Sequence, residues 1–223
     1  MNETGVVAAL AAEARTLGVP RGILVGVSGI GCAGAESTAR ALLDAGAGAL
    51  VSFGMAGGLD PALNAGAICV PGEVISADGA RFLTAQAWAK RVSASVFGSV
   101  AGGKLLTSVQ AIASVEDKAR VYRDTGAALV DMESLGVARI AALAGVPFIA
   151  VRVIVDTAAD VLPAAVAAAT RDGQVRIGRL IRALARSPAD LGAIFQLAHR
   201  YRAAIRSLQS VARSGVLVQA TLA

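Results

Sequence analysis

A strand–helix–strand pattern with an acidic residue after each strand constrains this chain most. An apolar run that ends at Val130 is soon followed by Glu133, and a longer β-branched run at 148–155 ends at Asp156. The segment 134–145 between them has the apolar spacing of a helix and ends on a glycine. This order is typical of a β-α-β unit with carboxylates at the ends of its strands.

The position of these two acids suggests a function. In open α/β sheets, ligands bind beyond the carboxyl ends of the strands, where Glu133 and Asp156 would both lie. Acidic residues also occur at such places as helix caps, because they complement the positive end of the helix dipole. A binding role and a capping role are therefore both open for each residue.

Alternating strand and helix patterns continue along most of the chain. We expect strands at 5–10, 22–27, 49–53, 67–70, 128–130 and 148–155, and helices between them at 35–45 and 134–144. Weaker patterns predict strands at 95–101 and 104–107 and helices at 82–92 and 114–123. The alternation predicts an α/β fold of one domain, with a mixed, mostly parallel sheet flanked by helices.

After Asp156 the pattern is helical only. We expect helices at 161–170, 175–185 and 189–212, the last of which begins after a serine and a proline. The predicted organisation is a catalytic domain over 1–186, an amphipathic helix over 187–213 packed on or beside it, and a loose tail over 214–223. An apolar stripe runs along this last helix at Leu191, Ile194, Phe195, Ala198, Ile205 and Leu208.

The charge is concentrated near the C-terminus. The chain has 223 residues, of which 55% are hydrophobic, so it can bury a substantial core. Its formal net charge is +5, and arginines outnumber acids strongly between Arg171 and Arg213. Aromatic residues make up only 4%, so base stacking is not indicated and we expect no nucleic-acid partner. A basic amphipathic helix can pack on the sheet with its arginines solvated, or contact an anionic membrane surface.

Other features indicate a cytoplasmic protein. The longest stretches without charge, 45–59 and 140–151, are interrupted by glycine or proline and are shorter than the roughly 20 residues of a membrane span. The N-terminus runs into a strand pattern without the features of a secretory signal. Cys32 and Cys69 are expected to be reduced thiols, and no set of metal ligands is apparent.

Two glycine-rich segments suggest anion or nucleotide contacts. In the segment 28–34, Gly29, Gly31 and Gly34 match the G-x-G-x-x-G dinucleotide fingerprint between a strand and a helix. The acid expected at the end of the next strand is missing, because that strand ends in Ser52, Phe53 and a glycine. Amide groups at such a loop still suit a phosphate or a ribose hydroxyl. A second turn of this kind is expected at 54–60.

Five motifs in order resemble the nucleoside phosphorylase and nucleosidase family. They are Gly5-Val6-Val7-Ala8-Ala9-Leu10-Ala11-Ala12-Glu13, Ser28-Gly29-Ile30-Gly31, Gly54-Met55-Ala56-Gly57-Gly58-Leu59, Val130-Asp131-Met132-Glu133 and Arg152-Val153-Ile154-Val155-Asp156-Thr157. The layout is similar to that of methylthioadenosine/S-adenosylhomocysteine nucleosidases. The basic helical C-terminus resembles that of the hopanoid-associated phosphorylases.

The resemblance implies that the protein cleaves the N-glycosidic bond of a purine nucleoside and releases adenine. Asp156 falls on the acid that contacts the purine and donates a proton to N7. Glu133 falls on the carboxylate that holds the ribose hydroxyls, with Met132 against the sugar. Glu13 aligns with the residue that activates water in the nucleosidases. Ala111 and Ile112 take the place of the base-stacking segment, without its usual aromatic residue.

The nucleophile is left open by the resemblance. Glu13 favours water, whereas phosphate would need a cationic or amide-rich site. The residues that could form the nucleophile or phosphate site are Ser28, Gly29, Gly31, Arg15, Met55 and Gly57. Arg15 could equally be a solvated arginine of the first helix.

The resemblance also implies partners. We expect an adenine nucleoside substrate with a 5′ substituent, such as adenosylhopane, in a homo-oligomer with potential peripheral contact to a membrane. No redox cofactor or metal is needed, although phosphate could be a co-substrate. The alternative is a Rossmann-like nucleotide-binding or dinucleotide-binding protein that cleaves no glycosidic bond.

Overall fold

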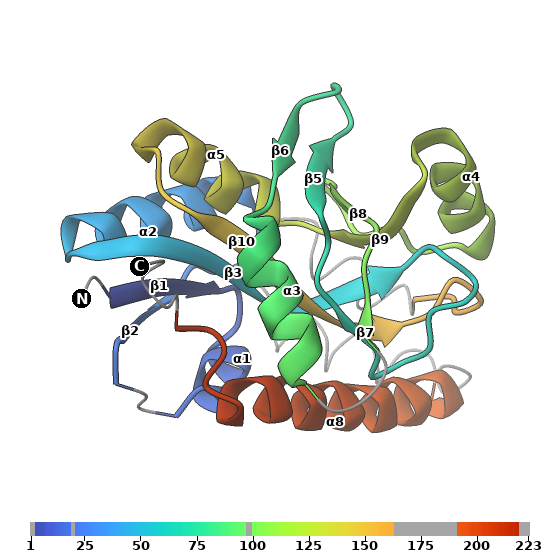
Figure 1. Ribbon diagram of the computed structural model, residues 1–223. Helices are drawn as coiled ribbons and strands as arrows, with labels where there is room; N and C mark the ends of the chain where they lie inside the picture. The colour runs from blue at the N-terminus through green and yellow to red at the C-terminus, as the bar shows by residue number, and fades with distance from the viewer. Residues whose placement is uncertain (1–2, 19–20, 97–99, 163–190, 219–223) are drawn as a thin grey trace.

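The computed structural model describes residues 3–18, 21–96, 100–162 and 191–218 (Figure 1). Its elements alternate between strand and helix, as the sequence pattern predicts. In chain order they are β1 (Glu3–Ala8), α1 (Ala11–Thr16), β2 (Ile23–Val27), α2 (Cys32–Asp44), β3 (Ala47–Gly58), β4 (Ile68–Cys69), β5 (Glu73–Ser76), β6 (Arg81–Leu83), α3 (Gln86–Ser95), β7 (Val100–Ala101), β8 (Lys104–Thr107), α4 (Val115–Thr125), β9 (Ala127–Asp131), α5 (Ser134–Ala144), β10 (Phe148–Asp156) and α8 (Leu191–Arg213).

Strand β3 is the centre of the sheet, which has ten strands among the residues that the structure describes. It pairs in parallel with β1 on one side and with β10 on the other, and β2 extends the sheet beyond β1. The last residues of β3, Gly57 and Gly58, pair antiparallel with β9. Strand β9 continues in parallel to β8 and β5, and β6 closes that edge as an antiparallel strand. The predicted α/β class with a mixed, mostly parallel sheet is confirmed.

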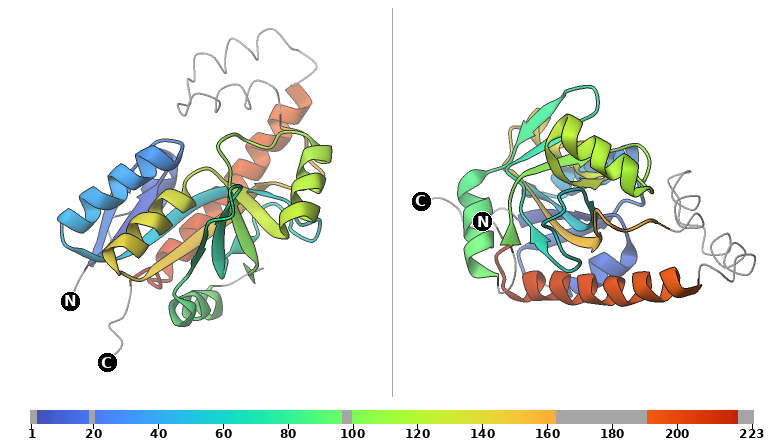
Figure 2. Two further views of the ribbon diagram at one scale, coloured as in Figure 1. Left: turned by 90° about the horizontal axis from the view of Figure 1, so that it is seen from above. Right: turned by 90° about the vertical axis from the view of Figure 1, so that its right-hand side faces the viewer.

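Helices cover both faces of this sheet. Alternate residues of β3 point to opposite faces, so Leu50 packs with α2 and α5, whereas Val51 and Phe53 pack with α3 and α8. Figure 1 shows α2 beside α5 on one face, and Figure 2 shows α8 running the length of the opposite face. A third apolar cluster joins β8 and β9 to α4 through residues such as Leu106 and Val121. Burial of the strands on both faces explains their nearly continuous apolar runs.

The structure corrects the second glycine-rich turn. The segment expected to turn at 54–60 remains in β3 as far as Gly58. The register of β3 against β10 continues to the pair Gly57 and Asp156, so the glycines are strand residues that bring two backbones close together. The consequence is that the carboxyl ends of β3 and β10 lie side by side, and the side chains that follow them share one site.

Several other elements differ from the sequence pattern. The short hairpin of β5 and β6 was not predicted, and the helix expected at 82–92 begins only at Gln86. Of the strand expected at 95–101, Ser95 belongs to α3 and Val100–Ala101 form β7, while 97–99 lie outside the described residues. The expected helices at 161–170 and 175–185 lie outside the described residues, except for Val161 and Leu162.

Part of the C-terminal helix packs against the sheet. Ala204, Leu208 and Val211 of α8 are buried against the sheet, whereas the side chains of 191–198, which include most of the predicted apolar stripe, are not described. The tail is not loose throughout. Leu217 is buried, and Trp88 Nε1 donates a hydrogen bond to the carbonyl of Val216 at 3.1 Å. None of the described helices is long and apolar enough to cross a membrane.

Candidate active site

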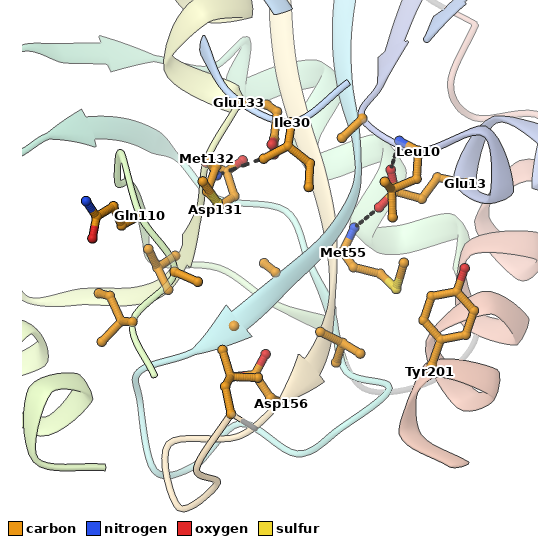
Figure 3. Close-up of a pocket in the computed structure, with 18 residues that line it drawn as sticks. Leu10, Glu13, Ile30, Met55, Gln110, Asp131, Met132, Glu133, Asp156 and Tyr201 are labelled. Carbon is orange, nitrogen blue, oxygen red and sulfur yellow. Dashed lines mark hydrogen bonds between the residues drawn. The ribbon is translucent and has the colours of Figure 1, made fainter. Parts of the chain in front are cut away.

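A pocket of about 280 Å³ opens beyond the carboxyl ends of β3, β9 and β10 (Figure 3). The loops after β1 and β8 and one residue of α8 complete its wall. Four acids line it, among them Asp131 at the end of β9; the other three come from different elements, Glu13 from α1, Glu133 from the start of α5 and Asp156 from the end of β10. All three side chains are nearly inaccessible to solvent. The parallel sheet thus delivers carboxylates that are far apart in sequence to one cavity.

Glu133 is the N-cap residue of α5, but its carboxylate does not cap that helix. Oε1 instead accepts a hydrogen bond from the amide of Gly31 at 3.0 Å, across the pocket edge. Burial raises the pKa of Glu133 to about 7, and Asp131 adds to this rise, while Arg152 and the Gly31 amide oppose it. A capping role does not account for this geometry, because the side chain faces a ligand-sized cavity.

Glu13 is held by two backbone amides. Its Oε1 accepts from the amide of Met55 and its Oε2 from the amide of Leu10, each at 2.9 Å. Burial raises the pKa of Glu13 above 4.5, although the Arg152 guanidinium and these amides pull it down. A fixed carboxylate with a raised pKa is well suited to accept a proton near neutral pH.

Asp156 forms an ion pair that the sequence did not predict. Its Oδ2 lies 2.5 Å from Nζ of Lys118, a completely buried residue of α4. The same ammonium donates to the carbonyls of Thr157 and Asp160 at 2.8 and 2.9 Å. Burial raises the pKa of Asp156, and Lys118 opposes that rise. Lysine is almost never fully buried unless it is paired, so the ion pair with Asp156 explains how Lys118 can be buried here.

A second buried cation lies behind the acids. Arg152, in the middle of β10, is 1% exposed and forms an ion pair with Asp131 at 2.7 Å. It also donates to the hydroxyls of Ser52 at 2.6 Å and Ser134 at 3.0 Å. Its positive charge lowers the pKa values of Glu13 and Glu133, against the rise that burial causes. Arg152 was not predicted as a site residue, although an arginine inside an apolar strand pattern was an available signal.

Gly54 leaves the space in which the arginine and the acid meet. A Cβ atom at this position would lie 2.7 Å from Nη1 of Arg152 and 2.7 Å from Oε1 of Glu13. Real Cβ atoms essentially never approach other atoms so closely. Glycine at this point of β3 therefore serves side-chain packing behind the pocket and not a turn.

The C-terminal helix supplies one aromatic side chain to the pocket. Tyr201 of α8 lines the wall on the same side as Glu13 and Met55 (Figure 3). Burial raises the pKa of Tyr201, and the nearby Glu13 carboxylate adds to this effect. Tyr201 was not predicted from the sequence, because the pattern of this helix indicated packing or membrane contact only.

The predicted site residues separate into two groups. Those that line the pocket are Glu13, Met55, Gly57, Ala111, Ile112, Met132, Glu133 and Asp156. Arg15 is exposed, and Ser28, Gly29 and Gly31 do not line the cavity. Gly31 nevertheless contributes through its amide on Glu133, and Ser28 donates its hydroxyl to the carbonyl of Gly29 at 2.7 Å. A phosphate contact by Arg15 stays a prediction, because this exposed side chain does not line the cavity.

Comparisons with known proteins agree with this architecture. No curated protein sequence matches the chain. Helicobacter pylori 5′-methylthioadenosine/S-adenosylhomocysteine nucleosidase, solved with butyl-thio-DADMe-Immucillin-A, superposes with a TM-score of 0.67 at 18% identity, over 83% of this chain and 99% of that one. Futalosine hydrolase of the same organism gives a TM-score of 0.66 at 18% identity, over 83% and 98%.

A variant of the Helicobacter pylori nucleosidase, solved with 5′-methylthioadenosine in its active site, covers more of this chain. Its TM-score is 0.69 at 17% identity, over 95% of this chain and 98% of that one. At these identities the structures establish a common fold. The family model described as "Phosphorylase superfamily" matches residues 15–186, which is most of the chain. The chain therefore belongs to the phosphorylase superfamily.

Proposed function

We propose that this protein hydrolyses the N-glycosidic bond of a 5′-substituted adenosine and releases adenine. The observation that carries the proposal is the convergence of Glu13, Glu133 and Asp156, all buried, on one pocket. Glycosidic cleavage of a nucleoside needs a group that protonates the base, a group that stabilises the developing positive charge of the sugar, and a group that activates the nucleophile. The three acids can divide these roles.

Asp156 is proposed to protonate N7 of adenine. It lines the same pocket as Ala111 and Ile112, which would contact the base through apolar side chains and backbone. The pKa of Asp156 is raised by burial, and this favours retention of a proton for donation. General acid catalysis of this kind typically contributes about 10²–10⁴-fold to the rate.

Glu133 is proposed to accept hydrogen bonds from the ribose hydroxyls, with Met132 against the sugar. Both residues line the pocket on the side opposite Glu13 and Met55 (Figure 3). A carboxylate close to the ribose also stabilises the positive charge that develops on the sugar ring in the transition state. Its existing bond to the Gly31 amide fixes its orientation before substrate binds.

Water is the better proposal for the nucleophile. Glu13 is held by two amides and can accept a proton from water. Phosphate would approach a pocket lined by four acids. The two buried cations beside them are already engaged, Arg152 by Asp131, Ser52 and Ser134 and Lys118 by Asp156. Arg15 is exposed and lies off the pocket, and the Gly31 amide is occupied by Glu133. These features favour hydrolysis over phosphorolysis.

The test measures adenine release and the sugar product with and without phosphate. Hydrolysis predicts a rate that is independent of phosphate and a free reducing sugar as product. A sugar 1-phosphate, formed only with phosphate present, would refute hydrolysis but keep glycosidic cleavage. Absence of adenine release from every 5′-substituted adenosine would favour the nucleotide-binding alternative.

An apolar 5′ substituent is proposed because most pocket walls are apolar. Leu10, Ile30, Met55 and Val155 line the cavity together with Tyr201. Adenosylhopane fits this chemistry, and 5′-methylthioadenosine is the soluble comparison. The ratio of kcat/KM for the two substrates is the measurement, and faster turnover of methylthioadenosine would contradict the lipid-linked substrate. A homo-oligomer and a peripheral membrane contact remain proposals, to be tested by light scattering and by vesicle sedimentation.

A further inference from the structure

Tyr201 carries a hydroxyl into the pocket that the roles proposed above do not use. In Figure 3 this hydroxyl points toward the side of the pocket that holds Glu13 and Met55. The charge of the Glu13 carboxylate adds to the rise that burial causes in the pKa of Tyr201, so the two groups interact. The hydroxyl forms no hydrogen bond within the part of the chain that the structure describes. A polar group that faces a pocket without a protein partner is a candidate contact for a bound molecule.

The neighbours of Tyr201 on α8 fix its position. The preceding residue, Arg200, forms an ion pair at 2.5 Å with Asp160, which lies in the turn after β10. About one and two helical turns further along, Ala204 and Leu208 are completely buried against the sheet. These contacts hold the aromatic ring at the pocket wall. Packing there would need only the ring, which phenylalanine also has, so the hydroxyl of Tyr201 requires a separate explanation.

A water molecule that attacks C1′ needs a second partner besides its base. One of its lone pairs forms the new bond and one hydrogen goes to Glu13, which leaves a hydrogen and a lone pair unused. A second hydrogen bond would fix the direction of attack. On the wall around Glu13, the side chains of Leu10 and Met55 are apolar, and the guanidinium of Arg152 is already engaged. Among the described side chains of this wall, Tyr201 therefore offers the unengaged polar group.

We propose that Tyr201 orients the attacking water, its hydroxyl oxygen accepting a hydrogen bond from the water hydrogen that Glu13 does not take. This inference rests on the proposed function. The water oxygen bonds to C1′ as the C1′–N9 bond breaks, and the electron pair of that bond moves to adenine, which takes its proton from Asp156. One water proton goes to Glu13, and the other stays on the new sugar hydroxyl. Tyr201 neither gains nor loses a proton in this step.

A contact between Tyr201 and the 5′ substituent is the competing explanation, and kinetics distinguish the two. A hydroxyl that orients water contributes to the chemical step, so its loss lowers kcat and leaves KM unchanged. A hydroxyl that binds the 5′ substituent equally in the ground state and the transition state contributes to substrate binding, so its loss raises KM and leaves kcat unchanged.

The test measures adenine release from 5′-methylthioadenosine by the wild type and by Tyr201→Phe. The loss of one hydrogen bond should lower kcat about tenfold, with KM and the melting temperature unchanged. A second measurement adds dilute methanol and determines the ratio of methyl glycoside to free sugar among the products. Methanol has a methyl group in place of the second hydrogen of water, so the wild type should favour water and Tyr201→Phe should favour it less. This ratio does not depend on how much of the variant is folded.

The chain offers a matched control, because its only other tyrosine lies away from the pocket. Tyr122 of α4 packs against a separate apolar cluster, and Tyr122→Phe should change neither kcat nor the product ratio. An unchanged kcat in Tyr201→Phe, with or without a higher KM, would overturn the orientation of water by Tyr201, and so would an unchanged product ratio. Either result would leave the proposed function standing. A wild type that releases no adenine would overturn the proposed function and this inference with it.

Discussion

Replacing Glu133 by glutamine should make the protein more stable at neutral pH and less active. The buried carboxyl has its pKa raised from 4.5 to about 7, so the folded state holds its proton more tightly than the unfolded chain does. At about 1.36 kcal/mol for each pH unit, this interval corresponds to about 3 kcal/mol. Below pH 4.5 the acid is protonated in both the folded and the unfolded state, so its burial carries no penalty for ionisation. As pH rises from 4.5 to 7 the wild type loses this stability, and above 7 the loss is complete.

Glutamine avoids that loss because it does not ionise, and its carbonyl can still accept the hydrogen bond from the Gly31 amide. The stability difference between Glu133→Gln and the wild type should therefore grow by about 3 kcal/mol between pH 4.5 and pH 8. For a chain of this length, this is a relative rise in melting temperature of about 6–12 °C. Adenine release should fall by about 10²-fold, because the carboxylate no longer stabilises the charged sugar.

The assay is thermal unfolding at several pH values, followed by circular dichroism. Glu116→Gln is the matched control, since Glu116 is exposed and its substitution should give a difference that is independent of pH. A difference between Glu133→Gln and the wild type that stays constant from pH 4.5 to pH 8 would refute the electrostatic reasoning. An unchanged rate of adenine release would refute the role of Glu133 at the ribose.

Three further predictions follow from the same pocket. Asp156→Asn should lower adenine release by about 10²–10⁴-fold and destabilise the fold by about 3 kcal/mol, because it leaves the Lys118 ammonium buried without its counter-charge. Adding Lys118→Met to this variant should restore the melting temperature but not the activity. Unchanged stability of Asp156→Asn alone would argue against the ion pair. Gly54→Ala should lower the stability by about 1–3 kcal/mol and the activity at least tenfold, because its Cβ would lie 2.7 Å from atoms of Glu13 and Arg152. Gly72→Ala is the control and should change neither unfolding nor turnover, because a Cβ there would have no atom within 4 Å. The kcat/KM of the wild type should fall at low pH as Glu13 becomes protonated, and because burial raises the pKa of Glu13, this fall should begin above pH 4.5. Glu13→Gln should be nearly inactive at every pH. A fully active Glu13→Gln would contradict the role of Glu13 as the base.

The sequence was sufficient for the parts of the site that follow from strand order. Glu133 and Asp156 follow apolar runs, and the parallel pairing of β3 with β10 places such strand ends together. Glu13 followed from the resemblance. The length of β3 was harder to predict, because clustered glycines in a sequence are typical of a turn. Only the packed structure reveals that Gly54 makes room for Arg152 and Glu13.

The partners of the acids could not be predicted from the sequence for a related reason. Lys118 lies on α4 among residues that have the spacing of a solvated crossover helix, with Asp117 and Arg120 paired at the surface beside it. Its burial depends on the turn after β10, which is distant in sequence. Tyr201 likewise reaches the pocket only because α8 returns across the sheet face. Long-range packing decided both positions, and periodicity along the chain carries no information about it.

Burying several carboxylates in one pocket costs free energy, and two buried cations offset part of that cost. Arg152 stands behind Glu13, Asp131 and Glu133, while Lys118 stands behind Asp156. Neither cation cancels the effect of burial, because the pKa values of Glu13, Glu133 and Asp156 remain raised. Raised values are what a proton donor and a proton acceptor need near neutral pH. Replacing either cation by an apolar residue should therefore shift the pH dependence of catalysis as well as the stability, which is a consequence that a surface salt bridge would not have.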